Sequence, residues 1–330
     1  MSIKICIVYS HHKLGDLIWQ LPYIQAISEH HRNNVDLILR NKTQGKKILK
    51  DLNHIDAVYY NDFRKGIYYW IDVLKLFKIF LKNRYTHVYM LDKVNKPAIA
   101  AKLAGIINII GPGIRNQKKW LTVKNFLEDK DFKLNYSEQS QKLLKLNKIQ
   151  LKNPYPNLIF NTSDYIKQNL DILPEGRKIA FGVDSFEDYK MWYEENFIEL
   201  ANKLSNLKIF DYIYLICGPD KCHISKKIID ISKKKYFIDC SQKNLTGVIT
   251  ALKNSEFFLG NNSGPLNLSA ALGVKSFGLI ANDPVSELKY SKIIPITPDN
   301  YTDNIWNRKR DGMKKLTVEK VYAKILENQN

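Results

Sequence analysis

The sequence predicts an α/β protein built from two doubly wound, mainly parallel sheets. Short apolar runs of strand length alternate with longer segments of helical periodicity, which is typical of strands joined by crossover helices. The alternation lapses in a Lys/Asn-rich stretch, residues 115–156, and then resumes. The chain has 330 residues, which is enough for two hydrophobic cores. We therefore expect two Rossmann-like domains, residues 1–155 with the linker and residues 156–330.

The first half alternates regularly from its start. The expected strands are Ile3–Tyr9, Val35–Leu39, Ala57–Tyr60, His87–Leu91 and Ile106–Ile110. The expected helices are Leu17–Glu29, Thr43–Leu52, Ile67–Lys82 and Pro97–Leu103, with a further helix at Ser137–Leu146. The inter-domain region is expected in the stretch that ends in "NPYPN".

The second half repeats the alternation. The expected strands are Ile179–Val183, Tyr212–Cys217 and Tyr236–Asp239, and the expected helices are Glu194–Leu204, Ile224–Lys233, Leu245–Lys253 and Thr317–Glu327. Between them, "EFFLGNNSGPLNLSAALGVKSFGLI" reads as strand, tight loop, short helix and strand. Pro265 near the start of that helix and Gly273 just past its end follow the usual asymmetry of helix termini.

The charge balance points to an anionic partner. With 51 Lys+Arg against 33 Asp+Glu, the formal net charge is +18, which favours nucleic acid, an anionic membrane face or phosphorylated substrates. The lysines are scattered and no RNA-binding or zinc-finger signature accompanies them, so we expect no nucleic-acid partner. The four cysteines form no C-x-x-C pair, and no export signal is seen near Met1. A cytoplasmic protein with buried thiols is the expectation.

The most apolar helical segment is Gly66–Asn83. Asp72, Lys75, Lys78 and Lys82 interrupt it too often for a membrane span. It is either a helix packed on the core with a solvated lysine stripe or a surface helix that leans on anionic lipid.

The opening of the short helix in the second half is a candidate anion site. Neither half carries a G-x-G-x-x-G fingerprint or a P-loop. In open α/β sheets, however, ligands bind outside the carboxyl ends of the strands. The strand that ends at Gly260 would place Asn261, Asn262, Ser263 and Gly264 at the exposed amides of a helix N-terminus, where an anion is favoured.

Other loops of the second half carry further candidates. Lys190 lies after one strand and just before the helix that begins near Glu194, a place suited to a diphosphate, although it is alternatively a solvated surface lysine. Ser185 would add a hydroxyl. Asp220 either accepts hydrogen bonds from sugar hydroxyls or is an ordinary turn residue.

In the first half, the loop after the first strand reads "SHHKLGD". Gly15 allows a close turn and places Asp16 at the head of the first helix. Asp16 is either an N-cap or a general base that accepts a proton from an attacking hydroxyl. His11, His12 and Lys13 are expected to line the acceptor side of this loop with Gly15.

Four segments together carry a family resemblance: "LGDLIWQLP", "KMWYEENFIELANKL", "CGP" and "GNNSGPLNLSAALGVKSFGL". In this order they resemble glycosyltransferase family 9, the ADP-heptose:lipopolysaccharide heptosyltransferases. The resemblance implies a GT-B fold, in which two Rossmann-like doubly wound domains face a central cleft. It also implies transfer with inversion at the sugar carbon, at the cytoplasmic face of the inner membrane.

The resemblance also implies residue roles. Asp16 matches the family's candidate catalytic base, and Lys190 matches a lysine that contacts the donor diphosphate. Asp220 falls near a donor-contacting acidic residue, and Ser263-Gly264 matches a pair whose backbone sits at the donor phosphates. This chain departs from the family's pattern at two positions: it has Asn262 where the family usually has aspartate and Asn267 where it usually has histidine.

The sequence thus predicts a metal-independent, inverting glycosyltransferase without a cofactor. It is expected to move heptose from ADP-heptose to a lipopolysaccharide core or related surface glycan. The N-terminal domain would bind the acceptor and the C-terminal domain the nucleotide sugar. The expected partners are the nucleotide sugar, a phosphorylated glycolipid or glycan, and an anionic inner membrane touched peripherally. The alternatives are a GT-B enzyme that uses another nucleotide sugar and a non-catalytic nucleotide-sugar or glycan-binding protein of the same fold.

Overall fold

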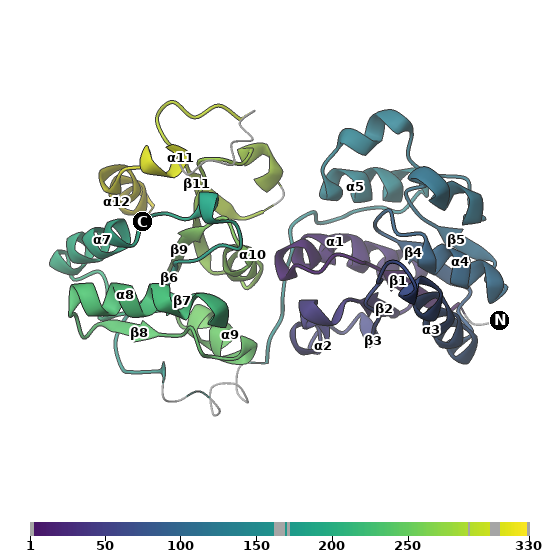
Figure 1. Cartoon of the computed structure of the whole chain (residues 1–330), viewed down its shortest axis with the longest axis horizontal. Coiled ribbons are helices and arrows are strands. Elements are labelled where there is room, and N and C mark those ends of the chain that lie inside the picture. Colours follow the sequence, from purple (N-terminus) through teal and green to yellow (C-terminus); the bar gives the residue numbers. More distant parts are fainter. Residues whose placement is uncertain (1–2, 162–168, 170–171, 290, 304–310, 329–330) are drawn as a thin grey trace. The chain divides into compact units, whose positions relative to one another are not determined.

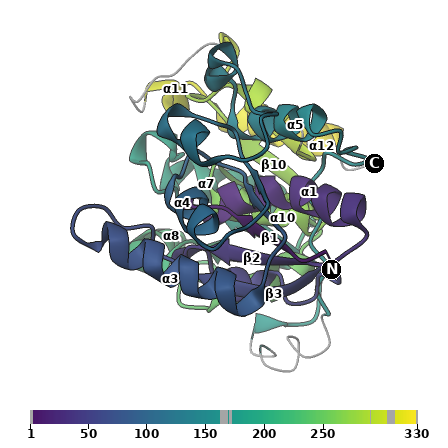
Figure 2. The same ribbon diagram turned by 90° about the vertical axis from the view of Figure 1, so that its right-hand side faces the viewer.

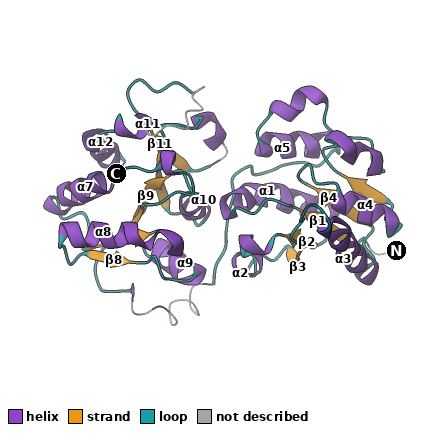
Figure 3. Cartoon of the chain, in the orientation of Figure 1, coloured by secondary structure: helices purple, strands orange, loops and turns teal. Residues whose placement is uncertain are grey.

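The computed structural model describes residues 3–161, 169, 172–289, 291–303 and 311–328. The chain divides into two compact units, Met1–Leu158 and Ile159–Asn330. Each unit contains a parallel sheet with helices on both of its faces (Figures 1 and 3). The predicted α/β class with two doubly wound sheets is therefore confirmed.

The first unit is built on a five-stranded sheet in the order β3-β2-β1-β4-β5. Its strands are β1 Ile5–Val8, β2 Val35–Leu39, β3 Ile55–Tyr60, β4 His87–Met90 and β5 Asn108–Ile110. Every pairing is parallel. The chain reverses its direction of growth across the sheet beside β1, and such a switch point is where open α/β sheets bind ligands.

Helices cover both faces of this first sheet. They are α1 Leu14–His31, α2 Gly45–Ile48, α3 Tyr68–Asn83, α4 Lys96–Leu103 and α5 Tyr136–Leu146. Cys6 and Val8 of β1 join the core formed with α3 and α4. Ile5 and Ile7 alternate to the opposite face, and α1 and α5 contact each other. We therefore assign α3 and α4 to one face and α1 with α5 to the other.

The Lys/Asn-rich stretch is not an inter-domain linker over its whole length. It contains short 3₁₀ helices at Arg115–Trp120 and Asp129–Lys133, followed by α5. Leu121 and Leu127 within it are buried. The residues from Arg115 to Leu146 thus fold as part of the first unit. The polar composition of this stretch did not indicate that it packs on the first unit, because a few buried leucines are enough to hold such a segment against a core.

The second unit is built on a six-stranded parallel sheet in the order β11-β10-β9-β6-β7-β8. Its strands are β6 Lys178–Gly182, β7 Tyr212–Ile216, β8 Phe237–Asp239, β9 Phe257–Asn261, β10 Lys275–Leu279 and β11 Ile293–Ile296. The sequence did not predict β11, because Pro295 argues against a strand. The sheet tolerates this proline because β11 lies at its edge.

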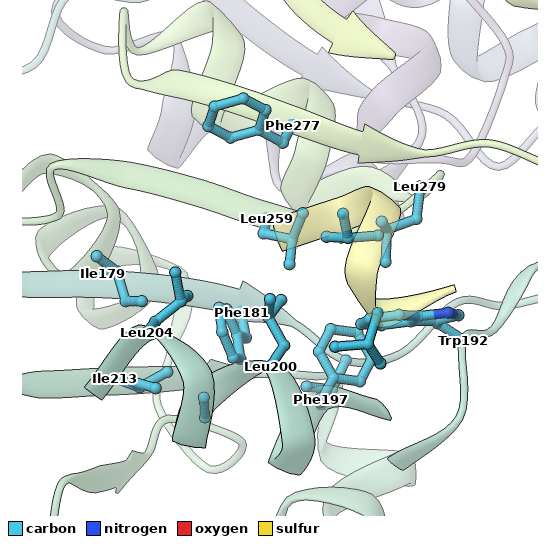
Figure 4. Packing of buried hydrophobic residues seen from close by; sticks show 14 of the residues in the cluster. Ile179, Phe181, Trp192, Phe197, Leu200, Leu204, Ile213, Leu259, Phe277 and Leu279 are labelled. Atoms are coloured by element: carbon cyan, nitrogen blue, oxygen red, sulfur yellow. The ribbon is translucent and has the colours of Figure 1, made fainter. Parts of the chain in front are cut away.

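The helices of the second unit are α7 Glu194–Asn206, α8 Cys222–Ser232, α9 Leu245–Lys253, α10 Gly264–Ala271, α11 Asp311–Lys314 and α12 Val318–Glu327. Figure 4 shows Phe181, Leu259 and Phe277 of the sheet on the same side as Leu200 and Phe197 of α7. On the other side, a Cβ atom at Gly278 would lie 3.0 Å from Leu266 of α10. Helix α10 therefore covers the face opposite α7.

Helix α3 buries Val73, Leu76 and Phe80 against the core of the first unit. This confirms that the apolar segment from Gly66 packs on the core along one side. Of the helices within the described ranges, none has the length and apolar character that crossing a bilayer requires.

Candidate active site

The start of α10 faces open space. Ser263 is its N-cap residue in extended conformation, and its side chain makes no capping hydrogen bond. A Cβ atom added to Gly264 would meet nothing within 4 Å. The first amides of a helix have no partner inside the helix, and its dipole favours negative charge there. The helix start at which we predict an anion is therefore open at Gly264, and Pro265 lies in its first turn as expected.

Buried polar atoms without a hydrogen-bond partner gather at the carboxyl ends of β6, β9 and β10, which are neighbours in the sheet. Among the residues that the structure describes, these atoms are Ser185 Oγ, Asn261 Nδ2, Ser263 Oγ, Asn267 Oδ1, Asn282 Oδ1 and Asp283 Oδ1. Buried polar groups are almost always hydrogen-bonded, because an unmade bond costs free energy. Half of the unpartnered buried atoms of the described residues lie at this sheet edge, which makes it the candidate site for a polar ligand.

Lys190 is held beside this edge by an acidic residue. Its Nζ lies 2.9 Å from Oδ2 of Asp283, whose side chain is only 4% exposed. Burial acts to lower the pKa of the Lys190 ammonium, but the Asp283 carboxylate, together with Tyr189 and Glu187, offsets burial and raises that pKa. Lys190 is therefore a positioned cation, not a freely solvated surface lysine.

Asn262 shares the same carboxylate. Its Nδ2 donates a hydrogen bond of 2.8 Å to Oδ2 of Asp283. Lys190 and Asn262, from the loops after β6 and β9, thus contact the same oxygen of Asp283, which lies in the loop after β10. Asp283 was missed in the sequence, although "LIANDP" places an acidic residue directly after an apolar strand, the same signal that singled out other loops.

The loop that carries Lys190 is fixed by its neighbour Trp192. The Trp192 amide donates to Oδ1 of Asn261 at 2.9 Å, and its indole Nε1 donates to the Leu316 carbonyl at 2.8 Å. The indole is fully buried beside Phe197 (Figure 4). A buried tryptophan whose polar atoms are both bonded holds its loop rigidly, so Lys190 has a defined position.

The close approach of β6 and β9 also depends on a glycine. A Cβ atom at Gly260 would lie 2.8 Å from the Gly182 carbonyl oxygen and 2.7 Å from the Phe258 ring. Only a residue without a side chain fits there. Gly260 thereby sets the position of Asn261 and Asn262, the next two residues.

The loop after β7 is joined to the loop after β6. Lys221 Nζ donates to the Ser185 carbonyl at 2.9 Å and to Oδ1 of Asp188 at 2.6 Å. The Gly218 amide donates to Oδ2 of Asp184 at 2.8 Å. Asp220 is exposed beside Lys221, and the structure brings it into no bond with the Lys190 group. Lys221, which the sequence did not single out, makes the contacts in this loop.

Asp16 lies in the first turn of α1 and is not its N-cap. The N-cap residue is Lys13, and α1 begins at Leu14, ahead of the predicted Leu17. A carboxylate in the first turn is still favoured by the helix dipole. The N-cap alternative is thus wrong, and the Asp16 carboxylate makes a different contact.

That contact is with His11. Its Nδ1 lies 3.4 Å from Oδ2 of Asp16, whose side chain is 35% exposed. The His11 ring stacks on Tyr9 and meets the edge of Tyr136 from α5, with centroid distances of 5.0 and 4.4 Å. Two residues that the sequence singled out separately, His11 and Asp16, are therefore in contact, and Tyr136 joins them, which local pattern could not indicate.

The remaining residues of this loop have separate positions. Gly15 is buried, whereas His12 and Lys13 are exposed. Burial, and then the positive charges of Arg40 and Lys13, lower the pKa of His12, so its imidazole is neutral near pH 7. The loop is fastened by Asp92 after β4, which accepts hydrogen bonds from the amides of Ser10 and Val94 at 2.5 and 3.0 Å.

The site residues were predicted to need no metal. Within the described ranges, no group of three or more His, Cys, Asp or Glu side chains is placed to hold a metal ion.

A family model for glycosyltransferase family 9 (heptosyltransferase) matches residues 73–324. The chain belongs to this family. The resemblance seen in the sequence is thereby confirmed. A search of curated proteins finds no match.

Solved structures of this family share the fold. The chain is similar to E. coli ADP-heptose lps heptosyltransferase II, with 14% identity, a TM-score of 0.80 and 98% of each chain covered. It is similar to E. coli heptosyltransferase WaaC with ADP, at 15% identity and a TM-score of 0.75, covering 99% of this chain and all of that one. A family 9 glycosyl transferase from Veillonella parvula gives 15% identity and a TM-score of 0.76, covering 100% and 99%. These likenesses confirm the predicted GT-B fold.

Proposed function

We propose that this glycosyltransferase family 9 protein moves heptose from ADP-heptose to a hydroxyl of a lipopolysaccharide core or related surface glycan, with inversion at the sugar carbon. Support comes from the family and from the ligands named for similar structures, which are ADP for one and ADP-2-deoxy-2-fluoro heptose for another. The reaction would take place at the cytoplasmic face of an anionic membrane.

The observation that carries the proposal is the cluster of unsatisfied polar atoms beside Lys190 and the start of α10. A nucleotide sugar brings a diphosphate and several hydroxyls, which match one cation, open helix amides and hydroxyl or amide side chains. In transfer, the bond between the sugar carbon and the diphosphate oxygen breaks. Negative charge then grows on the leaving diphosphate, where Lys190 and the helix start would stabilise it.

Asp16 is the proposed general base. Its carboxylate would take the proton from the acceptor hydroxyl as that oxygen attacks the sugar carbon opposite the departing diphosphate. The contact with His11 at 3.4 Å would orient the carboxylate. His12, Lys13 and Gly15 belong to the same loop and would line the acceptor, whose phosphate groups suit the basic charge of the chain.

The other residues would hold the donor sugar and phosphates. Ser185 and Ser263 offer hydroxyls, and Asn262 and Asn267 offer amides that both donate and accept. Asp220 would accept from a ribose or sugar hydroxyl. Because fixed cationic and amide groups supply the positive charge, we propose that transfer requires no metal ion. Full activity in EDTA supports this part, and loss of activity that magnesium or manganese restores contradicts it.

The test is a donor panel of ADP-heptose, ADP-glucose, GDP-mannose and UDP-glucose. Thermal stabilisation and the release of nucleoside diphosphate, with and without a heptose-free lipopolysaccharide core acceptor, are measured side by side. The proposal expects ADP-heptose to stabilise the protein and to be consumed only with the acceptor present. Exclusive use of a UDP- or GDP-sugar would support the other-donor alternative, and binding without turnover would support the non-catalytic one.

A further inference from the structure

Helix α3 is apolar on its exposed side as well as on its buried side. Val73, Leu76 and Phe80 pack into the core. Five large apolar residues instead face solvent and form what we call the α3 outer face: Ile67, Trp70, Ile71, Leu74 and Leu81, exposed by 83, 61, 53, 55 and 49%.

These five residues form one stripe. Residues three, four and seven apart on a helix lie on the same side. Ile67, Trp70, Ile71 and Leu74 follow this spacing, and Leu81 lies seven residues beyond Leu74, with Lys78 between the two. Single exposed apolar side chains are common on soluble proteins, but a contiguous apolar patch marks an interaction surface. Figure 2 shows α3 running in front of the strands of its own sheet.

Cationic side chains lie beside the stripe and within it: Lys75 and Lys82 flank it, and Lys78 stands between Leu74 and Leu81. Lys75, Lys78 and Lys82 are exposed on α3, and none of them pairs with a carboxylate among the described residues. The acidic residue of the helix, Asp72, is buried and bonded to Arg64 and Lys96 at 2.8 and 3.0 Å. The outer face therefore presents apolar and positive groups without a negative one.

We propose that the α3 outer face docks on an anionic phospholipid bilayer. Trp70, Ile71 and Leu74 enter the boundary between headgroups and acyl chains, and the three lysines contact lipid phosphates. A second copy of the chain fits less well, because two rows of lysine would meet. The helix is already ordered by its buried side, so docking requires no folding of a segment.

The α3 outer face is the surface through which the protein would contact the membrane in the proposed function, and the membrane location rests on that function. Its test does not depend on transfer, because vesicle binding is measured with full-length protein without donor or acceptor. Vesicles of phosphatidylcholine alone are compared with vesicles containing phosphatidylglycerol, by co-sedimentation. A failure here leaves donor use untouched, and a failure of the donor panel leaves vesicle binding untouched.

Two variants of the outer face are compared. The first is Trp70→Gln with Ile71→Gln and Leu74→Gln, and the second is Lys75→Glu with Lys78→Glu and Lys82→Glu. The matched control is Lys233→Glu with Lys234→Glu and Lys235→Glu, which changes the net charge equally at exposed positions of the other unit. All replaced side chains are exposed, and thermal unfolding checks that each variant is folded.

The expected result is binding of the wild type to anionic vesicles only. Affinity should fall at least roughly tenfold in the apolar variant and on the order of a hundredfold in the α3 lysine variant, while the control retains most of its affinity. An equal loss in the control would overturn the proposal in favour of diffuse charge. Unchanged binding by the apolar variant, or wild-type self-association that the same variant abolishes, would also overturn it.

Discussion

The Lys190 ammonium lies 2.9 Å from the Asp283 carboxylate, and the two residues reach each other from the loops after β6 and β10. The same carboxylate oxygen accepts a hydrogen bond from Asn262. A cation, an anion and an amide are thus fixed together beside the open start of α10. Asp283 thereby holds the largely buried Lys190 side chain in place.

Replacing Asp283 by Asn should destabilise the protein. It leaves the Lys190 ammonium, with a side chain 17% exposed, without its counter-charge. We expect the free energy of unfolding to fall by about 2 kcal/mol, less than for a fully buried pair. Chemical denaturation measures this value.

A double-mutant cycle measures the interaction energy between Lys190 and Asp283 apart from the other effects of each substitution. Lys190→Met should cost less stability in the Asp283→Asn background than in the wild type. The matched control is Asp299→Asn, which breaks the pair between Lys320 and the 88%-exposed Asp299 and should change stability by less than about 1 kcal/mol. Additive effects at Lys190 and Asp283 would mean that the two do not interact in solution.

Lys190→Ala should weaken donor binding and slow transfer together. If Lys190 faces the diphosphate both before and during the reaction, its charge acts in ground and transition states alike. Calorimetry with ADP-heptose and initial-rate kinetics measure the two effects. The control is Lys203→Ala, which removes a surface ion pair between α7 and α12. Donor affinity and rate equal to those of the control would rule out a phosphate role.

Asp16→Asn should abolish most transfer while nucleotide binding is kept. The amide retains the size of the side chain and its place in the first turn of α1 but cannot take a proton. A general base contributes on the order of 10²–10⁴-fold to the rate, so kcat should fall by that amount with an unchanged dissociation constant for ADP. The exposed Asp129→Asn serves as the control. A variant that turns over at the wild-type rate would exclude Asp16 as the base.

Stability should also decrease in mild acid because of His31. Burial, followed by the positive charges of His87 and His30, lowers the pKa of His31 to about 4, and its Nε2 contacts the Tyr89 hydroxyl at 2.8 Å. Because the unfolded imidazole has a pKa near 6.5, the unfolded chain binds the proton first as pH falls. This stability is full above pH 6.5 and is lost as pH falls toward 4.

Between pH 7 and pH 5 the loss should be about 1–2 kcal/mol. His31→Gln keeps a partner for Tyr89 and should flatten the dependence of unfolding free energy on pH. The exposed His223→Gln should leave it unchanged. A His31→Gln variant with the wild-type slope would show that other groups cause the acid sensitivity.

Local pattern was sufficient for the strands and most helices, because burial and periodicity are properties of neighbouring residues. Helix α7 begins at the predicted Glu194, and β2 has the predicted bounds. Strand β11 was missed because Pro295 is acceptable only at a sheet edge, and edge position follows from the order of the whole sheet. The site could be predicted as a set of loops but not as contacts. That Asp283 meets Lys190, or Tyr136 meets His11, depends on how distant segments pack.

The last prediction concerns Asn262, at which the resemblance to the family implies an aspartate. If that aspartate contacts the donor, Asn262→Asp should sharpen discrimination among ADP-sugars. In this chain, however, the new carboxylate would face Oδ2 of Asp283, which the Asn262 amide now contacts at 2.8 Å. Two carboxylates in contact raise the pKa of one of them. The folded variant then binds a proton more tightly than the unfolded chain, so its stability is full below the ordinary carboxyl pKa and is lost as pH rises.

We expect Asn262→Asp to lower the unfolding temperature at pH 8 much more than at pH 5. Adding Asp283→Asn should restore the unfolding temperature, because one carboxylate and one amide then remain beside Lys190. Thermal melts of the single and double variants at both pH values measure this, with the donor panel repeated on each. An equal fall in unfolding temperature relative to the wild type at the two pH values would contradict the placement of Asp283, whereas recovery in the double variant would show that the two carboxylates repel each other.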